Sequence, residues 1–284
     1  MVELSVNVNK VATLRNSRNG VEPRVTRAVE VCLEAGARSI TVHPRADERH
    51  IRRSDVFDIA ALLATVRSEP RGWPELNIEG DPRPDLIDLV LEVCPAQCTL
   101  VPVTPGEITS QAGWPPTTDR AWLGEVVRRL QGDGIRVSLF VDPDDAAVRW
   151  AADLGADRVE LYTEPFARAF ERGEGLASYE RYASTSVLAH GLGLGVNAGH
   201  DLDLHNLPLF RELPHLDEVS IGHALISDAL WMGLDESVDI EVYSPQSPLG
   251  AAILGHKVGE TVTYRAPAGH LIEVTVVEVK PFTA

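Results

Sequence analysis

Short apolar segments that alternate with longer helical segments are the feature that most constrains the fold of this chain. Eight segments rich in β-branched residues recur along it, and no tight hairpin signal joins two of them. Helices between strands indicate a parallel sheet, and eight such units predict a (β/α)₈ TIM barrel. The predicted strands cover residues 4–9, 39–42, 75–79, 97–101, 135–141, 158–161, 194–197 and 219–221. An open doubly wound sheet is the alternative, although no G-x-G-x-x-G turn follows the first strand.

The pattern changes after residue 238. Residues 240–284 contain Ser-Pro and Gly turns, and strand-like alternation at 261–264 and 271–279. We therefore predict a barrel domain at 1–238 and a small β-rich appendage at 239–284.

The composition excludes several classes of function. The 284-residue chain has 42 acidic and 26 basic residues, with a net charge of −16, whereas a nucleic-acid partner requires a basic surface. No apolar run approaches the ~18 residues of a membrane span. The first residues enter a strand without a signal segment, so we expect a cytoplasmic protein. The three cysteines, Cys32, Cys94 and Cys98, lack zinc-site spacing and an even disulfide count, and we expect buried free thiols.

Polar residues stand at or after the ends of at least six predicted strands. The carboxyl ends of barrel strands converge on one mouth, where the active sites of this fold lie. A single histidine is more often a satisfied structural residue, but agreement among six strand ends favours a functional site. The candidate residues are Asn7, Asn9, Lys10, His43, Arg45, His50, Glu79, Thr109, Glu160, His200, Asp201, Gly222 and His223.

These residue types indicate carbonyl and imine chemistry on phosphorylated substrates. Histidines and a buried glutamate can transfer protons near neutral pH. The Gly-His turns after the last two strands match the usual phosphate site of such barrels, and Arg18, Arg45 and His50 offer a second anion anchor. Metal hydrolysis fits less well, because no His-x-His pair ends the first strand and no H-E-x-x-H occurs. A Schiff-base lysine is also disfavoured, since only Lys10 stands at a strand end.

At these positions the sequence resembles the pyridoxine 5′-phosphate synthase family over about residues 1–238. The resemblance implies condensation of 3-amino-2-oxopropyl phosphate with 1-deoxy-D-xylulose 5-phosphate, without metal or organic cofactor, in a homo-octamer. The matching stretches are VNVNKVATLR at 6–15, ITVHPR at 40–45, RHI at 49–51, LNIE at 76–79, LVP at 100–102, EIT at 107–109, RVSLFVD at 136–142, VELYT at 159–163, GVNAGH at 195–200 and IGH at 221–223.

The resemblance also implies roles. His43 and Glu79 match an acid/base pair, His200 a proton donor, and Glu160 a group that stabilises charge in the transition state. The amino-ketone phosphate would bind at Asn7, Arg18, Asp201, Gly222 and His223. The deoxyxylulose phosphate would bind at Asn9, Lys10, Arg45, His50 and Thr109. The sequence departs from the commoner family motif, which has Asp-His for Asn9-Lys10, Gly for Asp201 and Leu for Pro44.

The C-terminal segment resembles the C-terminal half of Gre-type transcript cleavage factors. The matching stretches are SPLGAAILG at 247–255, VGETV at 258–262 and APAGH at 266–270. In that family this half belongs to a domain that binds RNA polymerase, so an RNA polymerase-binding module is one alternative function. An extension that packs on the barrel or on another subunit is the simpler interpretation of the tail. Another phosphosugar-processing TIM-barrel enzyme is the alternative for the barrel.

Overall fold

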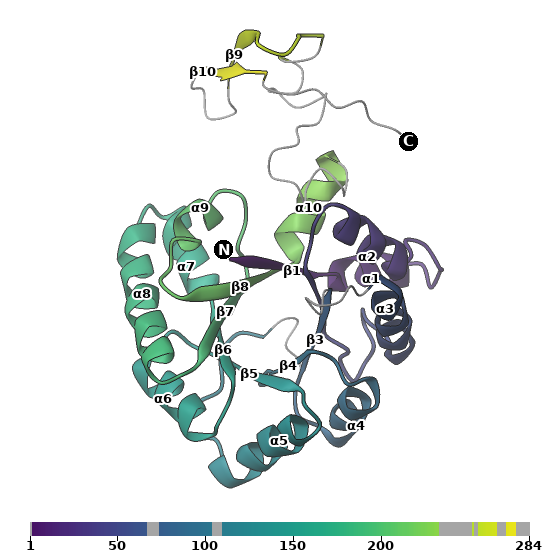
Figure 1. The fold of residues 1–284 in the computed structure, drawn as a ribbon, viewed down its shortest axis with the longest axis vertical. Helices are drawn as coiled ribbons and strands as arrows, with labels where there is room; N and C mark the ends of the chain where they lie inside the picture. The colour runs from purple at the N-terminus through teal and green to yellow at the C-terminus, as the bar shows by residue number, and fades with distance from the viewer. Residues whose placement is uncertain are drawn as a thin grey trace.

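The chain folds into a closed eight-stranded parallel barrel, which confirms the predicted TIM barrel (Figure 1). The computed structural model describes residues 2–66, 74–103, 110–232, 252, 255–265 and 271–276. The strands pair in chain order and β1 closes the barrel against β8, with Ser5 opposite Ser220. They are β1 (Glu3–Asn7), β2 (Ser39–Val42), β3 (Glu75–Gly80), β4 (Gln97–Leu100), β5 (Arg136–Val141), β6 (Arg158–Tyr162), β7 (Gly195–Gly199) and β8 (Leu216–Ile221).

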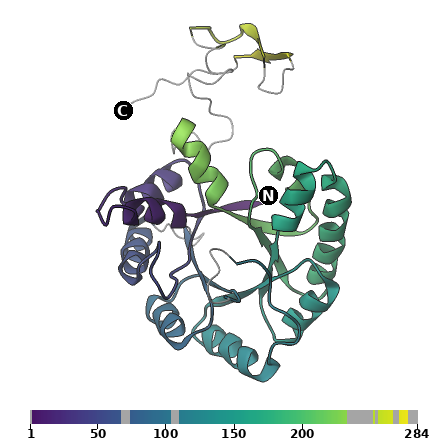
Figure 2. The same cartoon turned by 180° about the vertical axis from the view of Figure 1, so that it is seen from behind.

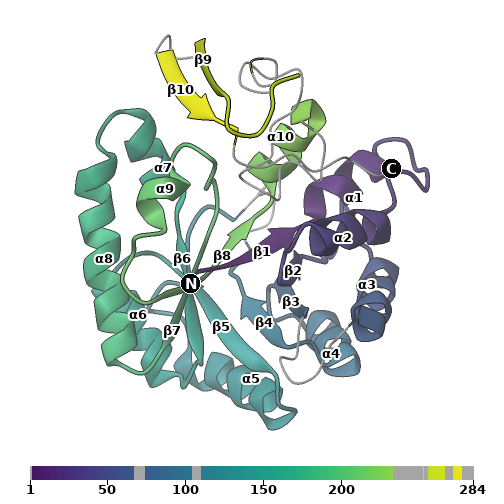
Figure 3. The same cartoon turned by 45° about the horizontal axis from the view of Figure 1, so that its top comes forward.

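Helices surround the barrel, and the same ring is visible from behind (Figure 2). α10 follows β8 and packs beside α1, which completes the ring (Figure 3). The described helices are α1 (Asn9–Asn16), α2 (Val25–Glu34), α3 (Arg53–Val66), α4 (Pro84–Val93), α5 (Arg120–Gly132), α6 (Asp145–Asp153), α7 (Glu164–Glu171), α8 (Gly175–Gly191), α9 (Leu207–Phe210) and α10 (His223–Met232).

The apolar core lies between the strands and the helices. Val137, Val159 and Val196 on adjacent strands are completely buried, as are large side chains on the helices such as Trp150 and Phe166. Burial of an apolar side chain of this size stabilises a fold by about 1.5–3 kcal/mol. The outer face of the sheet therefore supplies most of the hydrophobic stabilisation.

The inner face of the barrel is polar. Ser5, Thr41, Asn77 and Thr99 occupy neighbouring strands, and hydrogen bonds of 2.7, 3.3 and 3.1 Å join each side chain to the next. Alternate residues of a strand share a face, so Asn7, His43 and Glu79 lie on the same side as Ser5, Thr41 and Asn77. A satisfied polar layer therefore lies next to the residues predicted for the mouth.

Two helices differ from the sequence prediction. The first strand ends at Asn7 rather than at residue 9, and residues 9–16 form α1, because Val11, Ala12 and Arg15 make a short buried face among polar residues. α7 lies in a stretch where no helix was predicted, before α8.

Two further expectations on the barrel were wrong. β7 continues to Gly199, two residues beyond the predicted strand end at residue 197. Cys94 is exposed at the end of α4, whereas Cys32 and Cys98 are buried.

The C-terminal segment contains the antiparallel pair β9 (Thr261–Arg265) and β10 (Leu271–Thr275), with Thr263 opposite Glu273. This agrees with the predicted β-rich appendage. The proposed boundary at residue 238 and the predicted strand residues 277–279 lie outside the described residues. In the described part of the chain, no helix is long and apolar enough to cross a membrane.

Candidate active site

A cavity of about 680 Å³ opens at the carboxyl ends of the strands. Arg18 is exposed in the turn after α1 and is not among the residues that line the cavity, and Thr109 lies outside the described residues. The structure thus gathers most of the predicted residues around one space. Those that line it are Asn7, Asn9, Lys10, His43, Arg45, His50, Glu79, Glu160, His200, Asp201, Gly222 and His223.

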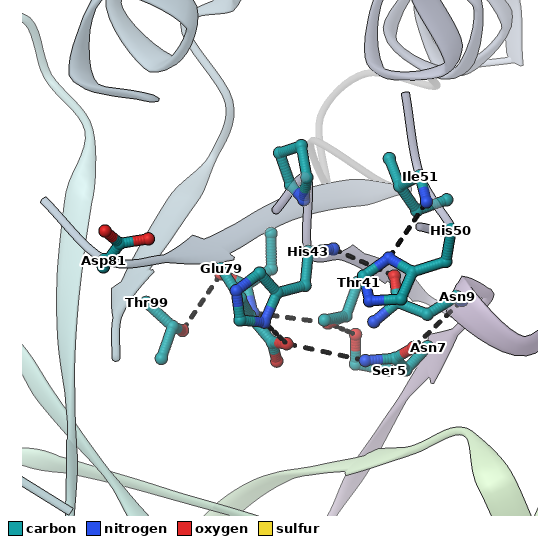
Figure 4. Close-up of polar contacts among 12 residues, drawn as sticks. Ser5, Asn7, Asn9, Thr41, His43, His50, Ile51, Glu79, Asp81 and Thr99 are labelled. Atoms are coloured by element: carbon teal, nitrogen blue, oxygen red, sulfur yellow. Dashed lines mark hydrogen bonds and ion pairs between the residues drawn. The ribbon is translucent and has the colours of Figure 1, made fainter. Parts of the chain in front are cut away.

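Asn7 and Asn9 join the ends of three strands (Figure 4). The Asn9 backbone N–H donates to Asn7 Oδ1 at 3.0 Å, and Asn9 Oδ1 accepts from the His43 backbone N–H at 2.9 Å. The Asn7 amide donates to Glu79 Oε2 at 3.5 Å. The two asparagines therefore fix the ends of β1, β2 and β3 relative to one another.

His43 and Glu79 face each other in the cavity wall, with 3.9 Å between His43 Nδ1 and Glu79 Oε2 (Figure 4). Burial lowers the pKa of His43 well below its usual value, and its electrostatic interactions with the nearby His50 and Arg45 lower it further. Burial, together with negative charge from Glu160 and Glu218, raises the pKa of Glu79 well above its usual value. The two shifts favour a neutral imidazole and a protonated carboxyl, so His43 is suited to accept a proton and Glu79 to donate one.

Arg83 holds the turn that carries His43. It donates to the Pro44 carbonyl oxygen at 2.7 Å and to Asp81 Oδ1 at 2.6 Å. Its charge also contributes to the low pKa of His43. Our sequence reasoning missed Arg83, because the Gly80-Asp-Pro-Arg83 turn gives no sign that this side chain returns to the preceding strand.

His50 presents a hydrogen-bond donor to the cavity. Its Nδ1 accepts from the Ile51 backbone N–H at 2.9 Å, and burial together with the Arg45 charge lowers its pKa to about 4. The neutral ring therefore carries its proton on Nε2. This N–H suits an anionic oxygen.

A buried ion pair supports the His50 loop from behind. Arg15 Nη1 and Nη2 contact the two Asp55 carboxylate oxygens at 2.5 and 2.9 Å, and both side chains are buried. Arg15 Nη2 and the Asn16 amide also donate to the His50 carbonyl oxygen, at 3.2 and 2.8 Å. Bidentate charge-assisted contacts of this kind fix orientation as well as contributing energy. α1 thus positions the loop between β2 and α3.

Two further carboxyls lie inside the barrel. Burial and the nearby Glu218 raise the pKa of Glu160 to about 8, and burial raises the pKa of Glu218 to about 7. Asn197 donates to Glu218 Oε1 at 3.1 Å, which explains why Asn197 faces inward rather than to the mouth. Gly199 is required beside them, since an added Cβ would lie 2.4 Å from Glu160 Oε1.

The turns after β7 and β8 form the opposite side of the cavity. An added Cβ on Gly222 would lie 2.8 Å from the Asn7 carbonyl oxygen, so only glycine allows β1 and β8 to approach this closely. α10 begins at His223, and its first residues line the cavity. The N–H groups and the dipole at a helix N-terminus favour an anion, so this side can hold a phosphate group.

Several lining residues were not predicted from the sequence: Ser110, Gln111, Tyr162, Glu164, Arg168 and Ser220 are examples. Tyr162 stands directly after Leu161, where strand six was expected to end, so one more strand residue would have included it. Glu164 and Arg168 lie on α7, the helix that our sequence reasoning missed. Across the described residues, no three His, Cys, Asp or Glu side chains are grouped so that they could hold a metal ion.

A closed parallel barrel whose strand ends gather histidines, carboxyls and cations around one cavity defines an enzyme of the TIM-barrel class. The family model described as Pyridoxal phosphate biosynthesis protein PdxJ matches residues 4–242. The chain belongs to this family, which confirms the resemblance found in the sequence. A second model, Transcription elongation factor GreA/GreB C-term, matches residues 232–281.

Relatives support the same assignment. The chain is 52% identical over 239 residues to the pyridoxine 5'-phosphate synthase of Bacteroides fragilis (strain YCH46), covering 84% of this chain and 97% of the relative. It is 51% identical to the enzyme of the same name from Porphyromonas gingivalis, covering 84% of this chain and 96% of the relative. A solved tryptophan synthase A-subunit from Pyrococcus furiosus matches with a TM-score of 0.53 at 12% identity, covering 85% and 98% of the two chains, which supports the fold alone.

Proposed function

We propose that this enzyme is a pyridoxine 5'-phosphate synthase that condenses 3-amino-2-oxopropyl phosphate with 1-deoxy-D-xylulose 5-phosphate. The products are pyridoxine 5'-phosphate, inorganic phosphate and water. Family membership supports this assignment. The observation that carries it is the cavity at the strand ends, whose lining combines His43, with a lowered pKa, and Glu79, with a raised pKa, with residue types that suit phosphate groups.

Two phosphate sites fit the two sides of the cavity. We assign the amino-ketone phosphate to Asn7, Asp201, Gly222 and His223, beside the N-terminus of α10. Arg18, which was also predicted for this phosphate, does not line the cavity. We assign the deoxyxylulose phosphate to Asn9, Lys10, Arg45 and His50, with Thr109 as a further prediction. Asn9 Oδ1 already accepts from the His43 backbone, so its amide group is the part assigned to substrate.

Proton transfer follows from the ionisation of the groups that line the cavity. When an amine adds to a ketone and water leaves, one group must accept a proton and another must protonate the departing hydroxyl. The lowered pKa of His43 suits it to accept the proton, and the raised pKa of Glu79 suits it to donate one. Glu160 lies close enough to Glu79 to affect its ionisation, and we assign it to stabilise charge that develops in the transition state.

His200 requires the substrate before it can donate a proton. Burial lowers its pKa, which favours the neutral ring. A phosphate dianion bound at the adjacent turns would raise that pKa, because a nearby negative charge favours the protonated imidazole. We therefore assign His200 as a proton donor that is charged by substrate binding.

The test is a direct assay of the full-length protein after dialysis against a strong chelator. With both substrates present, we expect pyridoxine 5'-phosphate and inorganic phosphate in equal amounts, and neither when one substrate is omitted. Phosphate release from a single phosphosugar would instead favour another phosphosugar-processing enzyme. A loss of turnover that only a divalent ion restores would contradict the proposed metal-free mechanism.

We further propose that the enzyme is a cytoplasmic homo-oligomer, with an octamer as the state implied by its family. Light scattering of the purified protein tests the assembly, and a mass of about one chain would contradict it. Contact between the C-terminal segment and RNA polymerase is the less favoured role of the tail.

A further inference from the structure

Thr163 stands immediately before α7, where its side chain would ordinarily cap the helix. A threonine at this position usually accepts a hydrogen bond from a backbone N–H in the first turn. Thr163 makes no such bond. Its hydroxyl, which is completely buried, instead donates to the end of the adjacent strand β7 and the turn that follows it, within hydrogen-bond distance of the carbonyl oxygens of Gly199, at 2.6 Å, and of His200.

The turn that receives this hydroxyl has an unusual backbone. His200 has φ 88° and Asp201 has φ 56°, both in the left-handed region that residues with a side chain rarely adopt. Such conformations are unfavourable and persist only where the surroundings enforce them. The Thr163 hydroxyl and the Thr163 backbone N–H, which donates to Gly199 O at 3.0 Å, both hold this turn.

The end of β6 also holds the His200 ring, together with a residue of β5. The imidazole packs against Phe140 at 5.3 Å and against Tyr162 at 5.2 Å between ring centroids. Tyr162 is fixed in turn, because the Tyr182 hydroxyl donates to its carbonyl oxygen at 2.6 Å. Residues 162 and 163 therefore hold the side chain and the backbone of His200 respectively.

We infer that Thr163 is a positioning residue, whose hydroxyl holds His200 and the neighbouring phosphate-binding turn in their reactive arrangement. This inference rests on the proposed function, in which His200 donates a proton. The hydroxyl does not touch the cavity, so it acts through the turn rather than on substrate. A misplacement of about 1 Å at a reacting group can lower a rate by about 10²-fold.

Thr163→Val is the sharpest perturbation, because valine keeps the branched shape and the backbone N–H and removes only the hydroxyl. We expect kcat/KM to fall by about 10- to 100-fold, with Thr163→Ser restoring most of it. Ser186→Ala is the matched control. The buried Ser186 hydroxyl also donates to a backbone carbonyl, that of Pro214, but at the amino end of β8. This control should keep wild-type kcat/KM.

A second measurement does not depend on turnover. The groups that influence the ionisation of His200 are Asp201, Glu164 and Lys10. Thr163→Val substitutes none of these residues. A change in the pKa of His200 therefore reports on the position of the ring. Using ¹³C-histidine NMR, with the signal assigned through His200→Asn, we expect the pKa of His200 to rise toward its ordinary value as the released ring gains solvent. Failure of the synthase assay with wild-type protein would refute the proposed function. The His200 titration could still be measured in Thr163→Val and would still test whether Thr163 positions the ring.

Three results would overturn the inference. They are unchanged His200 titration in Thr163→Val, an equal loss of activity in Thr163→Ser and Thr163→Val, or an equal loss in Ser186→Ala. If Thr163→Val does not fold, Thr163→Cys provides the same comparison, because a thiol is only a weak donor.

Discussion

Replacing Glu160 with glutamine should stabilise the fold while lowering activity. The folded carboxyl ionises with a pKa of about 8, raised from 4.5 mainly by burial. In the unfolded chain the same group ionises near 4.5. The stability that the protonated folded carboxyl contributes is therefore fully present below about pH 4.5 and is lost as the pH rises to about 8. At about 1.36 kcal/mol for each pH unit, the loss reaches roughly 5 kcal/mol.

Glutamine has almost the same volume and no proton to lose. Glu160→Gln should therefore match the wild type near pH 4.5–5 and become more stable than it by up to a few kcal/mol near pH 8. Thermal unfolding at pH 5, 6.5 and 8 measures this, with Glu171→Gln as the control, because Glu171 is exposed on the surface of α7. The same stability difference at pH 5 and pH 8, or a less stable variant at pH 8, would refute the reasoning.

The remaining predictions concern proton transfer, substrate binding, loop support and the tail. Glu79→Gln should lower kcat by about 10²–10⁴-fold, and a rate within threefold of wild type would remove Glu79 from acid–base catalysis. Arg45→Ala should raise the KM for deoxyxylulose phosphate much more than that for the amino-ketone phosphate, and an equal rise would argue against separate sites. Asp55→Ala should destabilise the protein by about 3–5 kcal/mol in denaturant unfolding, because it leaves the Arg15 charge buried and unpaired; a change below 1 kcal/mol would contradict this. A chain ending at Val238 should retain turnover, and an assembled but inactive protein would show that the tail contributes to the active site.

The sequence predicted the barrel because its signals are local. Periodicity identifies each strand, and the alternation with helices leaves few topologies, so β2 and β3 were placed to within one residue. The mouth was also predictable, since every parallel strand brings its carboxyl end to the same face. His43, Glu79 and His200 could be grouped on this basis alone.

What the sequence did not reveal depends on contacts through space. The Arg83 side chain donates to the Pro44 carbonyl oxygen, and the Thr163 hydroxyl donates to the carbonyl oxygen at the end of β7. Neither contact leaves a periodic signal in the sequence. Gly199 was assigned to a turn after strand seven, whereas it is the last residue of β7, where a Cβ would meet the Glu160 carboxyl. The ionisation of Glu79 and Glu160 depends on burial and on mutual proximity, which only the closed barrel defines.

The direction of α10 determines where a C-terminal addition joins the barrel. The helix begins at His223 in the cavity wall and ends at Met232, and ten residues at about 1.5 Å each carry the chain roughly 15 Å from the mouth. Any segment appended there is attached at the end of α10 remote from substrate entry. Gene fusion at this position can therefore give the chain a new module without requiring the catalytic opening to be rebuilt, which is the arrangement expected for an enzyme that has acquired an unrelated C-terminal extension.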